Sequence, residues 1–290
     1  MRLRVIVGIA IAALTMAPRA GAQVTFRTTG NELRDALADI WHIWVSPFRS
    51  EGRDWIAVAG VAAGTAALVP VDDQVDSWFV RHPNSALHDF AKPWDESNPT
   101  LGDLSTGRRL FPISAALIAS GMVSDNRKLR EAGWGCLSAW QASSSIRHAV
   151  YAGVARPRPS VENADPYNVD FPGGEWEDHS FFGGHAANAV ACTTFWNTRF
   201  EMGVLEPILY ASAAGISVAR MTDRRHWVSD TWVGVAVGYA MGRSIAARYA
   251  RREARRERDR VNEQIRMSLL DGLSLAPTRG GLAIRWSGQF

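Results

Sequence analysis

The sequence of 290 residues contains only two cysteines, Cys136 and Cys192, and both lie inside apolar stretches. Two cysteines exclude the disulfide framework that holds many small secreted domains together. A single disulfide bond would need an oxidising compartment. Because buried cysteines commonly behave as small apolar side chains, we expect two free thiols instead.

The chain also lacks a large excess of one charge. Its 32 lysine and arginine residues stand against 29 aspartate and glutamate residues, which gives a formal net charge of +3. The surplus basic residues gather near the C-terminal end, so the composition does not indicate a nucleic-acid partner. We find no internal repeat and no low-complexity tract, and the chain is long enough for one substantial core.

The N-terminal residues 1–22 are typical of an export signal. Two arginines open the segment, an apolar stretch follows, and the small residues 20–22 form a cleavage site. The alternative is a first transmembrane helix, which the short apolar stretch disfavours. We expect cleavage before Gln23 and a mature protein in a bacterial-type cell envelope, either periplasmic or membrane-associated.

Apolar residues recur with the helical period over most of the chain. The stretches with this period are residues 32–46, 54–69, 76–91, 109–123, 126–155, 184–198, 203–219 and 227–243. They predict an all-α fold, a helical bundle of about six or more helices. A charged helix follows, and alternating residues in 268–276 and 282–286 predict a small C-terminal β-hairpin.

These patterns divide the chain into four parts. They are a signal peptide at residues 1–22, an N-terminal segment with an amphipathic helix at 23–53, a helical domain at 54–250, and a charged helix extension with the hairpin at 251–290. Within the domain, glycines at four-residue spacing are typical of closely packed helices; they are Gly234, Gly238 and Gly242. The acidic residues 72, 73 and 76 are interpreted as capping and solvated turn residues.

Three stretches carry candidate chemistry, and the last contains His226 and Asp230, four residues apart. If a helix begins at Trp227, the two side chains share one face. We expect the Asp230 carboxylate to take the proton of one imidazole nitrogen, which leaves the other nitrogen as a nucleophile. Arg220 offers donors suited to a phosphate-like anion. Taken alone, the spacing also fits an ordinary helix start with surface charges.

The two other stretches lie upstream. Gly183 and Gly184 precede His185 where an apolar helix begins, and paired glycines at a helix start allow an anion to approach the backbone closely. Arg158 lies in an Arg/Pro turn that ends another apolar helix. The loop at residues 157–177, between these two stretches, is expected to roof the pocket.

Together and in this order, the three stretches resemble the type 2 phosphatidic acid phosphatase (PAP2) superfamily. That superfamily also contains bacterial acid phosphatases and vanadium haloperoxidases. Its motifs read Lys-(six residues)-Arg-Pro, Pro-Ser-Gly-His, and Ser-Arg-(five residues)-His-(three residues)-Asp. The matching stretches here run from Tyr151 to Pro159, from Phe182 to His185, and from Ala219 to Asp230.

The chain departs from these motifs at three phosphate-holding positions. Tyr151 replaces the lysine, Gly183 replaces the serine before Gly-His, and Ala219 replaces the serine before the arginine. Arg147 lies one turn before Tyr151 on the same helix face, so its side chain could reach the space of the missing lysine.

The resemblance implies a metal-independent phosphatase without a cofactor, acting through a phosphohistidine intermediate. His226 would be the nucleophile, Asp230 its support, and His185 the general acid and base. The implied phosphate-binding residues are Arg158, Arg220, Gly184 and Gly183, with Arg147 and Tyr151 at the position of the missing lysine. We expect a phosphorylated small-molecule or lipid substrate; the sequence indicates neither its identity nor the oligomeric state.

Two other functions remain open. A non-catalytic protein would keep the bundle to bind a lipid or a partner while its phosphate cradle decays. A vanadium haloperoxidase would hold vanadate on His226, which the missing lysine disfavours. Several apolar runs reach the lower edge of the roughly 20 residues that span a bilayer, so we expect a membrane-associated bundle rather than a soluble one.

Overall fold

The computed structural model describes residues 26–98, 101, 102, 104, 106–170, 179–271, 273–278 and 281–286. The predicted signal peptide lies outside these residues. The described chain is mostly helical, which confirms the predicted helical fold. It forms two compact units, Met1–Ala246 and Ala247–Phe290, and the predicted domain boundaries stay predictions.

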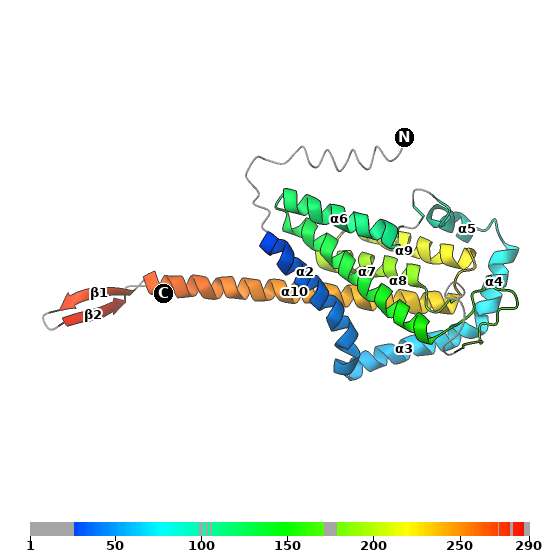
Figure 1. The fold of residues 1–290 in the computed structure, drawn as a ribbon, viewed down its shortest axis with the longest axis horizontal. Coiled ribbons are helices and arrows are strands. Elements are labelled where there is room, and N and C mark those ends of the chain that lie inside the picture. The colour runs from blue at the N-terminus through cyan, green and yellow to red at the C-terminus, as the bar shows by residue number, and fades with distance from the viewer. Residues whose placement is uncertain are drawn as a thin grey trace. The chain divides into compact units, whose positions relative to one another are not determined.

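Figure 1 shows the helices of the chain. The α-helices are α2 (Phe26–Val45), α3 (Gly52–Leu68), α4 (Asp72–Arg81), α5 (Ala86–Ala91), α6 (Gly107–Val123), α7 (Arg127–Gly153), α8 (Gly184–Phe200), α9 (Leu205–Thr222) and α10 (Val228–Asp271). Short 3-10 turns occur at η1 (Ser46–Arg49), η2 (Val69–Val71) and η3 (Lys92–Trp94). Helix α7 packs against α2, α6 and α8, and α8 also packs against α9.

The second unit contains the rest of α10 and two strands, β1 (Leu273–Thr278) and β2 (Gly281–Trp286), which pair antiparallel. Ser268 to Asp271, which the sequence assigned to the first strand, belong to α10. The C-terminal hairpin stays a prediction, because only the helical part of the predicted fold is confirmed.

Two helix boundaries differ from the predictions. Helix α2 begins at Phe26, six residues before the predicted start at residue 32. The stretch predicted as one helix over residues 76–91 is divided into α4 and α5, because Pro83, two residues after the end of α4, cannot continue its hydrogen-bond ladder.

The predicted glycine spacing packs α10 against α8. A methyl group added to Gly234, Gly238 or Gly242 would collide with a backbone carbonyl oxygen in or just before α8. Only hydrogen fits in this interface, so the two helix backbones lie in direct contact. The contact at Gly234 is with Gly183, which places the start of α8 beside the first turns of α10.

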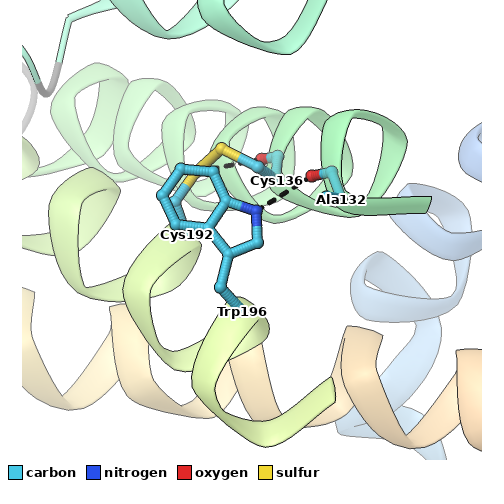
Figure 2. Close-up of a disulfide and its surroundings, with 4 residues drawn as sticks. All are labelled: Ala132, Cys136, Cys192 and Trp196. Carbon is cyan, nitrogen blue, oxygen red and sulfur yellow. Dashed lines mark hydrogen bonds between the residues drawn. A yellow bond between two sulfur atoms is a disulfide. The ribbon is translucent and has the colours of Figure 1, made fainter. Parts of the chain in front are cut away.

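The two cysteines form a disulfide bond between α7 and α8, so the expectation of two free thiols was wrong (Figure 2). Cys136 and Cys192 are both almost fully buried. Beside them, the indole N–H of Trp196 donates a 3.0 Å hydrogen bond to the carbonyl oxygen of Ala132. The helical period places each cysteine on an apolar face, but it does not show that the two faces meet.

One exposed helical stretch has the length and composition of a membrane span. Among the described residues, only Gly52–Arg81 meets this test, and none of its apolar window is buried. Exposed large side chains on α3 include Trp55 and Ile56. This surface is compatible with membrane association.

Replacing Cys136 and Cys192 by serine should lower the free energy of unfolding by about 2–4 kcal/mol, since the bond constrains the unfolded chain. Urea denaturation measures the change. Dithiothreitol should destabilise the parent chain by a similar amount and leave the double variant unaffected. Equal stability of the parent and the double variant would show that the cross-link does not stabilise the fold.

Candidate active site

The site forms where α8 and α10 begin. His185 lies in the first turn of α8, and His226 lies just before α10. The backbone N–H of Gly183 donates a 3.0 Å hydrogen bond to the backbone carbonyl of Asp230, which ties the two helix starts together. Because this N–H is already used, Gly183 is not the phosphate donor that the sequence predicted. Its Cα also lies close to the backbone of α10, so a side chain at this position would press on that helix.

The orientation of His226 is set by a backbone carbonyl. Its Nδ1 lies 2.6 Å from the carbonyl oxygen of Ser180, and the residue is only 5% exposed. A carbonyl oxygen can only accept, so Nδ1 carries the proton and the neutral ring has its lone pair on Nε2. Asp230 was predicted to hold this imidazole, and that prediction was wrong.

Asp230 instead belongs to a buried ion network. Its carboxylate accepts from Arg156 Nη1 at 2.5 Å and from the backbone N–H of Trp227 at 3.0 Å. The other terminal nitrogen of Arg156 donates to Asp72 at 2.7 Å. Asp72 also accepts from the backbone N–H and the hydroxyl of Ser229, at 2.9 and 2.6 Å.

This network corrects two interpretations of the sequence. Asp72 is fully buried and is not a solvated turn residue, and Arg156 is a structural residue that the motifs did not single out. Burial raises the pKa of Asp230 to about 6, although Arg156 opposes the shift. The only signal for Arg156 in the sequence was that the Arg/Pro turn contains an arginine besides Arg158. This signal did not identify its partner Asp72, which lies 84 positions earlier.

His185 has no hydrogen-bond partner for its buried Nε2 atom in the part of the chain that the structure describes. Burial lowers the pKa of His185 to about 3, and the nearby charges of Arg220 and Arg147 act in the same direction. Burial also lowers the pKa of His226 well below its ordinary value, and His185 adds to this effect. Both imidazoles are therefore neutral in the empty site.

The side chain of Arg147 was expected to reach the space of the missing lysine, and this stays a prediction. A methyl group added to Gly184 would collide with the Arg147 side chain, so the arginine lies directly against the start of α8. Its guanidinium lies 4.5 Å from the centre of the Tyr151 ring. Its buried Nε atom has no partner among the described residues. The ring of Tyr151 thus packs against the guanidinium of Arg147.

Two further arginines complete the cationic surroundings. Arg158 donates from Nε to the carbonyl oxygen of His179 at 3.2 Å. Arg220, only 3% exposed, donates to Glu96 at 2.8 Å and to Asp223 at 2.9 Å. The sequence did not single out Glu96 and Asp223, because neither residue stands at a position for which the motifs name an amino acid.

Residues 134–254 match the model of the PAP2 superfamily. This match supports assignment of this part of the chain to the PAP2 superfamily. The match contains all three motifs and most of α7, all of α8 and α9, and the first half of α10. Comparisons with curated proteins and with solved structures found no match.

Membership of the PAP2 superfamily suggests a phosphatase type of function. The chain retains both histidines and the arginines of the PAP2 motifs, and the structure gathers them at the start of α8 and α10. The charges of Arg147 and Arg158 lower the pKa of both imidazoles.

Arg156→Met should lower the free energy of unfolding by about 3–5 kcal/mol, because it leaves Asp72 and Asp230 buried without their cation. Urea denaturation measures this loss. The exposed Arg225→Met is the control, and its stability should stay within about 0.5 kcal/mol of the parent. Adding Asp230→Asn to Arg156→Met should cost less than the sum of the single changes. A loss below about 1 kcal/mol for Arg156→Met would contradict the structural role of the network.

Proposed function

We propose that this chain is a metal-independent phosphatase that hydrolyses phosphate monoesters or lipid phosphates and diphosphates through a phosphohistidine intermediate. The observation that supports it best is the hydrogen bond from His226 Nδ1 to the carbonyl of Ser180. This bond leaves the lone pair on Nε2, beside a second neutral imidazole and several arginines. Such a group is a nucleophile in surroundings that stabilise transferred negative charge.

In the first step, Nε2 of His226 attacks phosphorus and the bond from phosphorus to the leaving oxygen breaks. The protonated form of His185 gives its proton to that oxygen and becomes neutral. In the second step, His185 takes a proton from water, the water oxygen attacks phosphorus, and the phosphorus–nitrogen bond breaks. Inorganic phosphate leaves, and both histidines return to their initial states.

The arginines stabilise the transferred phosphoryl group. Its oxygens carry the negative charge of the transition state, and positioned cations lower the barrier most where that charge develops. Arg158 and Arg220 take the roles that the PAP2 motifs give them, and Arg147 takes that of the lysine. The backbone N–H of Gly184, at the first residue of α8, adds the favourable field of a helix start.

An apolar groove beside the site supports a lipid phosphate as one class of substrate. The groove has a volume of about 1290 Å³ and is lined by side chains of α3, α9 and α10, together with Phe181. Phe181 lies four residues before His185, so the groove reaches the segment that carries the general acid. An acyl or prenyl chain fits this lining, and it would add binding energy that a soluble monoester lacks.

Phosphate release from a short-chain phosphatidic acid and from an aryl phosphate tests the proposal. His226→Ala should abolish release from both, and Arg147→Ala should lower kcat/KM by about 10²–10³, since it removes a donor aimed at the transition state. Arg147→Lys should retain part of the activity. The exposed neighbour His148→Ala is the matched control and should behave like the parent.

Two results would contradict this assignment. Wild-type turnover by His226→Ala would mean that another group attacks phosphorus. Unchanged kinetics for Arg147→Ala would mean that the missing lysine has no substitute in this chain.

The pH dependence should reveal His185 as the acid. Because its pKa is about 3 in the empty site, the protonated fraction rises about tenfold for each pH unit between 7 and 4. Burial lowers the pKa of His226 well below its ordinary value, so this imidazole is protonated less readily than a free one as the pH falls. We therefore expect kcat/KM for phenyl phosphate to increase as the pH falls from 7 to 5.

His185→Gln separates this effect from titration of the substrate. The ratio of parent to variant kcat/KM should grow as the pH falls, because only the parent gains a protonated acid. A ratio that does not change with pH would show that His185 does not donate the proton.

A further inference from the structure

Arg220 is already occupied by carboxylates of the same chain. Its Nη1 donates to Glu96 Oε2 at 2.8 Å and its Nη2 donates to Asp223 Oδ2 at 2.9 Å. Asp223 follows α9 directly, so it is a local partner of the arginine. Glu96 lies 124 positions earlier, just after η3. A buried guanidinium needs a nearby negative charge, and Glu96 supplies part of it.

Glu96 is held less firmly than the arginine that it contacts. Its side chain is 49% exposed, whereas that of Arg220 is 3% exposed. Burial alone would raise the pKa of Glu96, but Arg220, His185 and Arg225 together lower it below its ordinary value. The carboxylate is therefore ionised and lies within the field of the catalytic imidazole. An exposed anion in this position can be displaced into water.

A carboxylate and a phosphoryl group use the same donors of an arginine, since both present oxygens to the guanidinium fork. The two cannot occupy Nη1 of Arg220 at once, and like charges at one site repel each other. The Nε atom of Arg220 is buried and has no partner in the described chain, so one donor of the guanidinium is not used by a carboxylate.

We propose that Glu96 is an internal competitor for the phosphate site, which a phosphoryl group must displace from Arg220 in order to bind. This inference rests on the proposed function, in which Arg220 holds a phosphoryl oxygen. Glu96 then weakens the binding of every anion that contacts the site through phosphate alone. Inorganic phosphate, the product, is the clearest such anion, so Glu96 assists product release.

The same contact selects among substrates. Competition by Glu96 has its full effect on a substrate that binds only through its phosphoryl group, and it weakens the binding of that substrate. A substrate with an apolar part recovers affinity outside the phosphate site. Glu96 is in this sense a specificity-determining residue that disfavours small monoesters.

Isothermal titration calorimetry with inorganic phosphate at pH 7 tests the proposal on the full chain. Glu96→Gln keeps the shape of the side chain and removes its charge, so its Kd for phosphate should fall on the order of tenfold or more relative to the parent. Glu96→Ala should shift the Kd in the same direction. Glu206→Gln, which is exposed at the opposite end of α9, is the matched control and should leave the Kd unchanged.

Arg220→Ala, alone and combined with Glu96→Gln, assigns the binding to this site and should abolish it in both backgrounds. An unchanged Kd for both Glu96 variants would overturn the proposal. Weaker binding would also overturn it and would show that Glu96 positions Arg220 for the phosphate. Absence of phosphate binding in every variant overturns it as well.

Hydrolysis of an aryl phosphate, measured on the same samples, separates this inference from the proposed function. Tighter phosphate binding by Glu96→Gln without hydrolysis by any variant would support the competitor and reject the phosphatase. Hydrolysis by the parent with equal Kd values for the parent and Glu96→Gln would support the phosphatase and reject the competitor.

Discussion

A single buried cation, Arg156, holds together the segments that shape the site. Its guanidinium lies between Asp72 at the start of α4 and Asp230 in the first turn of α10. None of the three charges is stable in the interior without the others, so the three segments form one unit. His226 lies two residues before α10 and is fixed by this arrangement together with the carbonyl of Ser180. The ion network thus helps to position His226, although the imidazole makes its hydrogen bond to Ser180 and not to Asp230.

The electrostatic design of the site follows from the same constraint of burial. Neutral imidazoles are stable near several guanidinium groups, because burial and neighbouring cations both disfavour a second positive charge. The cations in turn need counter-charges, and Arg220 finds them in Glu96 and Asp223. Before any phosphate binds, the site is balanced by its own carboxylates. Under the proposed function, the binding of a phosphoryl group exchanges one anion for another.

The sequence predicted the helical fold and a close helix contact at the glycines of α10, because both depend on local period and spacing; it did not name α8 as the partner. The role of Arg147 as a substitute for the missing lysine stays a prediction, since it depends on more than the one helical turn that separates it from Tyr151. The sequence failed where a partner lies far along the chain. The four-residue spacing of His226 and Asp230 fixes a common face, but it cannot show that Arg156 captures the carboxylate. The disulfide bond escaped prediction for the same reason, because two apolar faces do not reveal that they meet.

The disulfide bond between α7 and α8 also fixes how far along each helix the site residues lie. From Cys136, α7 runs 11 residues to Arg147, which is about 16 Å at 1.5 Å per residue. From Cys192, α8 runs back 7 residues to His185, which is about 10 Å. A slip of one helix along the other by a single turn would move the arginine about 5.4 Å away from the histidine. The covalent bond prevents this slip. It therefore fixes the axial register of the two helices, and with it the positions of Arg147 and His185 relative to each other.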